Sequence, residues 1–349
     1  MRILCFGAGA IGTYIGGSLA LSGQEVVFIE RPEIASALAG RGLHLALPTG
    51  EQTVAQPRMA TSVEDALAGG GFDFAIFAVK SFDTLPLLQS LAGVVDRMPP
   101  LLSLQNGVEN EPVLAQVLGA ERVIPATVTS AVGRRDAGDI VLERLRGVGV
   151  ADTGPLAREI FAALEVAGLK PRLYANAAAM KWSKLLTNLV ANATSAIMNM
   201  SPAEIFSDPN LYRVEVRQLR ETLRVMAAQG IPVVDLPGTP SKLLAFGLRW
   251  LPLALLQPLL KRAAGSGRGG KMPSFHIDLY SGRSKSEVEF LNGAVVRFGQ
   301  RYGVPTPVNQ VLTRTLTAMA AGEMPKEAFA RQPKMLLQEI RAAETARAS

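Results

Sequence analysis

Arg2-Ile-Leu-Cys-Phe-Gly7-Ala-Gly9-Ala-Ile-Gly12 opens the chain with an apolar run that passes directly into three spaced glycines. The apolar run predicts a β-strand, and residues 13–22 predict the helix that follows it. In such a turn Gly7 permits the sharp bend, Gly9 lets the backbone approach a pyrophosphate, and Gly12 lets the helix pack closely on the strand. Because a helix start also offers free N–H groups and a partial positive charge, we predict a dinucleotide-binding loop here.

A second strand is predicted over residues 25–29, and it ends in Glu30-Arg31. A carboxylate at this position suits the ribose 2′-OH of NAD, whereas an arginine suits the 2′-phosphate of NADP. Consecutive side chains at a strand end point to opposite faces, so we expect only one of the two to reach the ribose. The residues themselves leave the choice between the two cofactors open.

Two further apolar runs end in polar residues. The run at 74–79 is followed by Lys80, and the run at 101–105 is followed by Asn106. Ligands of open α/β sheets bind beyond the carboxyl ends of the strands, so both side chains are expected near a cofactor or substrate. The alternatives are a solvated loop lysine and an ordinary turn. Strands predicted at 123–129 and 139–143 complete an N-terminal domain over residues 1–172.

From residue 173 to residue 349 the pattern changes to helical periods. One helix is predicted over 176–198, in which Lys184, Asn188 and Asn192 follow one side at intervals of four. The alternative interpretation is a helix with an ordinary polar surface. Another helix is predicted over 284–302 with Glu287 in its first turn, where a carboxylate is also favoured simply by the helix dipole.

Composition limits the classes of function. The chain has 349 residues, of which 48% are hydrophobic, 6% aromatic and 19% charged, so it has ample material for two globular domains. A net charge of +6 is compatible with anionic ligands, but no basic block is interleaved with aromatic residues, so we expect no nucleic-acid partner. One cysteine and two histidines argue against disulfides within the chain and against a Cys-based or multi-His metal site, so no metal is expected.

The apolar stretch at 243–260 is the other feature that needs an explanation. Arg249, Pro252, Gln257 and Pro258 interrupt it, which argues against a membrane span and favours a pair of buried or half-buried helices. A membrane-surface helix and an oligomer contact stay open as alternatives, as do a monomer and a homodimer. The glycines at the start of the chain interrupt any signal-like apolar run, so we expect a cytoplasmic protein with neither a membrane span nor a membrane as partner.

Taken in order, these motifs resemble the ketopantoate reductase (2-dehydropantoate 2-reductase) family over about residues 1–325. The matching motifs are Gly7 to Gly12, Val79-Lys80, Gln105-Asn106-Gly107, Lys181-Trp-Ser-Lys184 with Asn188 and Asn192, Pro273-Ser274 with Asp278, and Glu287 to Gly293. The resemblance implies an α/β protein with an N-terminal Rossmann-type doubly wound sheet and an all-α C-terminal domain over residues 173–349. It also implies a site in the cleft between the two domains.

The resemblance further implies NADPH-dependent reduction of 2-dehydropantoate, a 2-oxo acid, to (R)-pantoate in pantothenate biosynthesis. By resemblance, the catalytic residues are Lys184, the proton donor, and Glu287, which helps to orient the substrate and to hold the environment of the lysine. Lys181, three residues before Lys184, is a secondary candidate that we expect to support the domain junction or the charge of the cleft rather than to donate the proton. The implied substrate-binding residues are Asn106, Asn188, Asn192, Ser274 and Asp278. The implied cofactor-binding residues are Gly7, Ala8, Gly9, Ala10, Ile11, Gly12, Arg31, Lys80 and Asn106.

Three alternatives accompany this interpretation. A related reductase of another 2-oxo acid or ketone shares the two-domain plan, although relatives of the β-hydroxyacid dehydrogenase kind place the asparagine closer to the lysine. A nicotinamide-binding sensor without turnover can dispense with the pair Lys184 and Glu287, which this chain retains. NADH stays an alternative cofactor because Glu30 stands beside Arg31.

Overall fold

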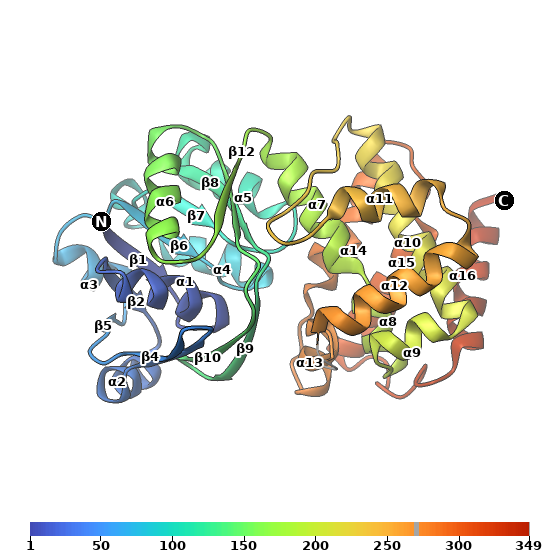
Figure 1. The fold of residues 1–349 in the computed structure, drawn as a ribbon, viewed down its shortest axis with the longest axis horizontal. Coiled ribbons are helices and arrows are strands. Elements are labelled where there is room, and N and C mark those ends of the chain that lie inside the picture. The colour runs from blue at the N-terminus through green and yellow to red at the C-terminus, as the bar shows by residue number, and fades with distance from the viewer. Residues whose placement is uncertain (269–271, 349) are drawn as a thin grey trace. The chain divides into compact units, whose positions relative to one another are not determined.

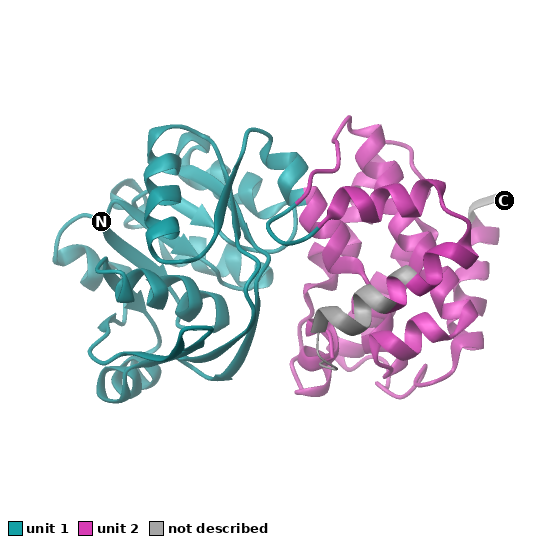
Figure 2. Cartoon of the chain, viewed as in Figure 1, with its two compact units in different colours: residues 1–181, 236–239 teal, residues 182–235, 240–349 magenta. Residues whose placement is uncertain are grey.

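The chain forms two compact units in the computed structural model, which describes residues 1–268 and 272–348. The first unit comprises residues 1–181 with 236–239, and the second comprises 182–235 with 240–349 (Figure 2). The division falls inside helix α7 (Ala177–Leu189). Residues 173–181, which the sequence assigned to the C-terminal domain, therefore lie in the first unit.

The first unit is built on an eight-stranded sheet in the order β12-β11-β8-β7-β6-β1-β2-β5. All neighbours are parallel except β8 and β11, and Cys5 of the central β1 pairs with Phe28 on one side and Ile76 on the other. The chain order reverses between β1 and β6, so the ligand-binding crevice is expected at the carboxyl end of these strands. The strands are β1 (Arg2–Phe6), β2 (Glu25–Ile29), β5 (Arg58–Ala60), β6 (Phe74–Phe77), β7 (Leu101–Ser103), β8 (Val123–Val128), β11 (Val148–Ala151) and β12 (Pro171–Tyr174).

Both faces of this sheet are buried, which explains the nearly continuous apolar runs of its strands. Along β1, Ile3 and Cys5 belong to one hydrophobic cluster, whereas Leu4 and Phe6 belong to the other. The first cluster is covered by α1 (Ala10–Leu21) and α6 (Pro155–Val166), and the second by α3 (Val63–Ala68), α4 (Thr84–Ser90) and α5 (Asn110–Leu118) (Figure 1). The predicted doubly wound α/β sheet is confirmed.

A second sheet of four strands, in the order β4-β3-β10-β9, was not predicted. Its strands are β3 (Leu43–Leu47), β4 (Gly50–Val54), β9 (Ala131–Asp136) and β10 (Asp139–Arg144), and helix α2 (Pro32–Arg41) precedes β3. The strand predicted at 139–143 exists, but it pairs with β9 and β3 rather than with the main sheet. The reason is the tight turn at Gly138, whose φ of +67° favours glycine and which returns the chain antiparallel to β9.

The second unit consists of helices among its described residues. Besides residues 182–189 of α7, they are α8 (Asn192–Met198), α9 (Pro202–Ser207), α10 (Pro209–Ala228), α11 (Ser241–Trp250), α12 (Leu253–Arg268), α13 (Ser274–Tyr280), α14 (Asn292–Arg301), α15 (Pro307–Ala321) and α16 (Pro333–Ala348). The helix predicted over 284–302 is wrong in its first part, because Glu287–Phe290 form a short 3₁₀ helix before α14 begins. A search of the described helices finds none that is long and apolar enough to cross a bilayer. The predicted helical C-terminal half is confirmed.

Candidate active site

The loop between β1 and α1 has the geometry that its three glycines predict. Gly7 has a φ of +88°, in the region that side chains disfavour. A Cβ at Gly12 would lie 1.9 Å from the Gly7 carbonyl oxygen, so helix and strand approach too closely for any other residue. A Cβ at Gly9, by contrast, would meet no atom within 4 Å, which leaves open space beside the helix start. This space and the α1 N-terminus, which no side chain caps, fit a pyrophosphate.

The two glycines are therefore expected to respond differently to alanine. Gly12→Ala should lower the free energy of unfolding by about 1–3 kcal/mol, the usual range for overpacking, because the backbone has to move. Gly9→Ala should unfold like the unaltered protein but bind a nicotinamide dinucleotide more weakly, since the methyl group would occupy the open space beside the start of α1. Urea unfolding and NADPH fluorescence titration measure the two effects, and equal unfolding free energies for both variants would contradict this geometry.

Glu30 turns its carboxylate into the glycine loop. Its Oε1 accepts a hydrogen bond of 2.7 Å from the Ala8 backbone N–H, while Oε2 accepts one of 3.3 Å from the Arg31 N–H. The Arg31 side chain is exposed. Beneath the loop, the buried Cys5 thiol has a raised pKa, first because of burial and second because of the nearby Glu30 charge. The two residues at the end of β2 thus have different surroundings, as expected for consecutive positions at a strand end.

Lys80 and Asn106 follow neighbouring strands, and polar side chains tie their two loops together. The Ser81 hydroxyl donates to the Asn106 carbonyl oxygen at 3.1 Å, and the Asn110 amide donates to the same oxygen at 2.7 Å and to Ser81 Oγ at 3.1 Å. Gln105 adds a link from its amide to the Val79 carbonyl oxygen at 3.0 Å. The backbone at both predicted ligand-binding positions is therefore fixed by a shared network.

A buried ion pair supports the second of these loops. Lys181 Nζ lies 2.7 Å from Glu111 Oε1, and the two side chains are only 5% and 12% exposed. The ammonium also donates to the carbonyl oxygens of Gln105 at 2.6 Å and Ala126 at 3.3 Å. Glu111 Oε1 accepts a further hydrogen bond of 2.8 Å from the Ser103 hydroxyl. Lys181 thus holds the backbone of Gln105, the residue that precedes Asn106.

The helix predicted over 176–198 is interrupted, and this part of the prediction is wrong. α7 ends at Leu189 and α8 begins at Asn192, with Ala191 between them in a left-handed conformation at φ +49°. The fully buried Glu215 of α10 accepts the Ala191 N–H at 2.8 Å and also bonds the Thr194 hydroxyl. Lys184 and Asn188 therefore share α7, whereas Asn192 lies beyond the break rather than on a continuous stripe.

The break brings predicted substrate-binding residues together. The Asn192 amide donates to the Asn188 carbonyl oxygen at 3.1 Å and to the Ser274 hydroxyl at 3.4 Å, and Asn192 Oδ1 accepts the Phe275 N–H at 3.1 Å. Asn192 is buried and Ser274 is exposed. Segments that lie about 80 residues apart along the chain thus form one polar cluster within the second unit.

The two predicted acidic residues of this unit are both buried. Asp278 lies one turn after Ser274 on α13 and forms an ion pair of 2.9 Å with Arg283. Glu287 opens the 3₁₀ helix and is 4% exposed, although its side chain is ionisable. Few ionisable side chains are buried to this extent, and the functional role of Glu287 stays a prediction.

Two supporting acids, Glu111 and Glu215, were not predicted. Glu215 had a detectable signal, since it falls in line with the apolar positions Leu211 and Leu219 of the amphipathic α10, where an acid is unusual. Glu111 had none, because its partner Lys181 lies 70 residues further along the chain.

Comparison with known proteins identifies both halves of the chain. The family model for ketopantoate reductase PanE/ApbA matches residues 3–155, and the model for its C-terminal part matches residues 176–320. The 2-dehydropantoate 2-reductase of Archaeoglobus fulgidus is 28% identical over 326 residues, which cover 92% of this chain and 98% of that protein. A PanE/ApbA family ketopantoate reductase from Ralstonia eutropha has a similar structure, with a TM-score of 0.77, 26% identity, and coverage of 93% of this chain and 99% of that one.

A structure of D-mandelate dehydrogenase with NADH and anilino(oxo)acetate shares the fold as well, with a TM-score of 0.75 and 22% identity over 92% of this chain and 99% of that one. At that identity the likeness concerns the fold alone. The two family models together span most of the chain, in the same order as the two structural units. The chain therefore belongs to the ketopantoate reductase PanE/ApbA family of oxidoreductases.

Proposed function

We propose that this chain reduces the ketone of 2-dehydropantoate to (R)-pantoate with NADPH, a step of pantothenate biosynthesis. The observation that carries the proposal is the cluster of Asn192, Ser274 and the Asn188 carbonyl oxygen, which lies on and beside the helix that bears Lys184. The Asn192 amide and the Ser274 hydroxyl, together with the Asn188 amide that we assign to the same role, suit the hydroxyl end of a small keto acid. Curated relatives named 2-dehydropantoate 2-reductase support this choice of substrate.

In the proposed reaction, the cofactor supplies hydride to the keto carbon of the substrate. Negative charge then develops on the carbonyl oxygen and needs a hydrogen-bond donor followed by a proton. We assign both tasks to the Lys184 ammonium. Glu287 orients the substrate, and the cluster around Asn192, with Asp278 one turn from Ser274, holds the far end of the molecule.

The cofactor is proposed to bind on the first unit. The loop from Gly7 to Gly12 and the α1 N-terminus take the pyrophosphate, and Lys80 and Asn106 line the nicotinamide side of the crevice. Arg31 takes the 2′-phosphate, because Glu30 is already bonded to the Ala8 N–H. The proposal requires that residues of both units meet the substrate in an interdomain cleft when both ligands are bound.

Steady-state oxidation of NADPH tests the substrate. We expect kcat/KM for 2-dehydropantoate to exceed that for pyruvate, 2-oxoisovalerate and phenylglyoxylate by at least about tenfold, since each lost polar contact costs about 1 kcal/mol or more. If another 2-oxo acid is reduced as efficiently, the assignment of 2-dehydropantoate fails while the assignment as a reductase stands.

Arg31→Ala tests the cofactor. Loss of a charged contact to the 2′-phosphate is expected to raise KM for NADPH by about tenfold or more, as for loss of a charge-assisted hydrogen bond, and to leave KM for NADH nearly unchanged. Glu30→Gln is the matched control, because it keeps an acceptor for the Ala8 N–H. Equal changes of KM for the two cofactors would show that Arg31 does not contact the phosphate.

A second candidate is an NADH-dependent reductase of another 2-oxo acid. It is favoured by the position of the Glu30 carboxylate at the glycine loop, where the same group suits a ribose 2′-OH. A preference for NADH in the unaltered enzyme, together with poor turnover of 2-dehydropantoate, would select this candidate.

A further inference from the structure

Helices α11 and α12 expose four large apolar side chains to solvent. Leu243, Phe246, Trp250 and Leu255 are 68%, 55%, 73% and 59% exposed. These four are among the eleven exposed large hydrophobic residues of the described part of the chain, and they fall within thirteen consecutive positions. We call these four side chains, together with the exposed Lys242, Arg249 and Lys261, the α11–α12 face.

The opposite sides of the two helices are firmly attached to the second unit. Ala245 and Leu248 of α11 and Leu256 and Leu260 of α12 are buried. Hydrogen bonds reinforce this packing: Arg220 Nε donates to the Leu248 carbonyl oxygen at 2.7 Å, the Tyr212 hydroxyl to Leu253 at 2.7 Å, and the Gln257 amide to Phe206 at 2.9 Å. The hydrophobic side chains of the α11–α12 face are therefore held outward by a docked helix pair.

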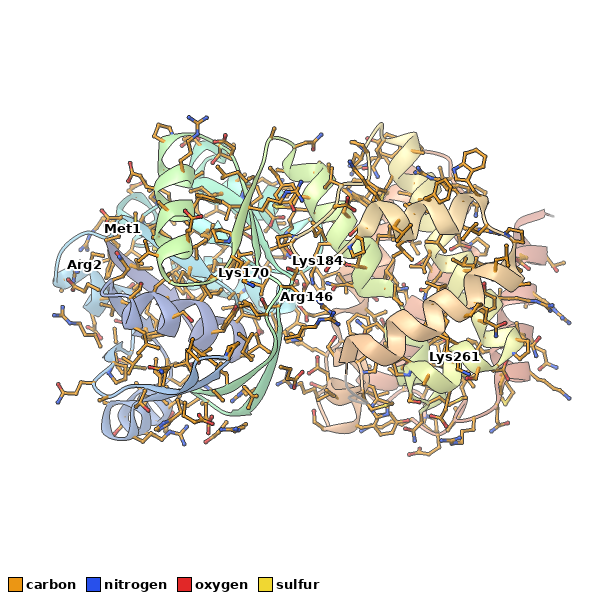
Figure 3. All side chains as sticks on the ribbon, viewed as in Figure 1. Met1, Arg2, Arg146, Lys170, Lys184 and Lys261 are labelled. Carbon is orange, nitrogen blue, oxygen red and sulfur yellow. The ribbon has the colours of Figure 1, made fainter. Side chains whose placement is uncertain are left out.

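All charged residues in the segment that forms α11 and α12 are basic. Residues 241–268 contain five basic residues, Lys242, Arg249, Lys261, Arg262 and Arg268, and no acidic residue. At about 100° per residue, Leu243, Phe246 and Trp250 occupy a sector of about 60° on α11, and Lys242 and Arg249 lie along one edge of it. Figure 3 shows Lys261 on α12. Aromatic and aliphatic side chains flanked by cations are typical of helices that lie in a lipid–water interface.

We propose that the α11–α12 face binds the surface of a membrane that contains anionic lipids. The apolar side chains enter the headgroup region, where the amphipathic indole of Trp250 is favoured, and the cations contact lipid phosphates and carboxylates. A two-fold contact between copies of this chain is disfavoured, because it would bring Lys242 and Arg249 of both copies together without an acid in the segment. The helices lie on the bilayer and do not cross it. This activity is independent of the proposed reaction.

Intrinsic fluorescence of the full chain offers a direct test. The chain has two tryptophans, of which Trp182 is 3% exposed and Trp250 is 73% exposed, so a change of emission on docking reports on Trp250. With vesicles of phosphatidylcholine and phosphatidylserine we expect a blue shift, and co-sedimentation at least about tenfold greater than with phosphatidylcholine alone, since several cations act together. High salt should reduce the difference. Absence of binding, or equal binding to the two vesicle types, would overturn the proposal.

Variants separate the contribution of the apolar side chains to membrane binding from that of the basic side chains. Phe246→Ser/Trp250→Ser should lose vesicle co-sedimentation, and Lys242→Glu/Arg249→Glu should lose the preference for phosphatidylserine, with the reductase activity unchanged in both. Val166→Ser removes an equally exposed apolar side chain, 73% exposed, from the first unit and should leave binding intact. Self-association without lipid binding, abolished by the same variants, would identify a second copy as the partner and refute the membrane proposal. If a variant misfolds, the fluorescence change and the salt dependence of vesicle binding by the unaltered protein still test the membrane proposal.

Discussion

Lys184→Ala is expected to lower kcat by about 10²–10⁴, the usual contribution of a positioned general acid. The residue stands on α7, one turn before Asn188 and half-buried in the second unit. In the proposed reaction, loss of the ammonium leaves the developing oxyanion without the hydrogen-bond donor and the proton source that we assign to Lys184. NADPH affinity should stay nearly constant, because the predicted cofactor residues lie in the first unit. Stopped-flow single turnovers with 2-dehydropantoate measure the chemical step directly.

Lys334→Ala is the matched control, since it removes an exposed lysine from α16. It should behave like the unaltered enzyme. Lys184→Arg keeps the charge but not a readily released proton, so it should recover substrate binding more than kcat. Full turnover by Lys184→Ala, with correct folding, would remove this lysine from the reaction.

Lys181→Met is expected to be the most destabilising of the substitutions considered. It leaves the Glu111 carboxylate buried without its ammonium, and breaking a buried pair in this way costs about 3–5 kcal/mol. The Gln105 and Ala126 carbonyl oxygens lose a donor as well. The unfolding free energy from urea titration of the cofactor-free protein gives the loss.

The double variant Lys181→Met/Glu111→Leu distinguishes two causes of the lost stability, namely a buried carboxylate without a partner and the loss of packing. Replacing both partners of a buried pair by apolar residues is often nearly neutral, so this variant should recover most of the stability lost in Lys181→Met. Its kcat/KM should nevertheless be lower than that of the unaltered enzyme, because the Gln105 carbonyl oxygen, just before Asn106, has lost its Lys181 donor. Additive costs of the two single substitutions would show that the pair acts by packing alone.

Local signals in the sequence were sufficient for the central sheet and the glycine loop. The strand, turn and helix from Arg2 to Leu21 follow from apolar runs and from glycines whose lack of a side chain permits the local turn and the close approach of the helix to the strand. The break at Ala191 gives no such signal, because neither glycine nor proline marks it. A buried carboxylate 24 positions away, Glu215, stabilises that left-handed turn, and a long-range contact of this kind is invisible to periodicity.

The candidate site, like the fold, was predictable from local sequence signals only in part. Lys80 and Asn106 were placed by a general rule about strand ends, and the structure does put them after β6 and β7. The assignment of Asn192 and Ser274 to the same substrate site followed only from the resemblance to a family, and the hydrogen bond between them was not predicted, since no pattern links residues so far apart. The roles of Lys184 and Glu287 in the reaction stay predictions that the variants above test.

Cys5 is a natural probe of local opening in the first unit. Its thiol is the only one in the chain, lies in the central strand with no exposed surface, and has a raised pKa. A thiol reagent therefore modifies the chain only after β1 and the glycine loop have opened. The rate at which the Cys5 sulfur is labelled, with and without NADPH, measures how often the centre of the eight-stranded sheet opens. The measurement needs no engineered label.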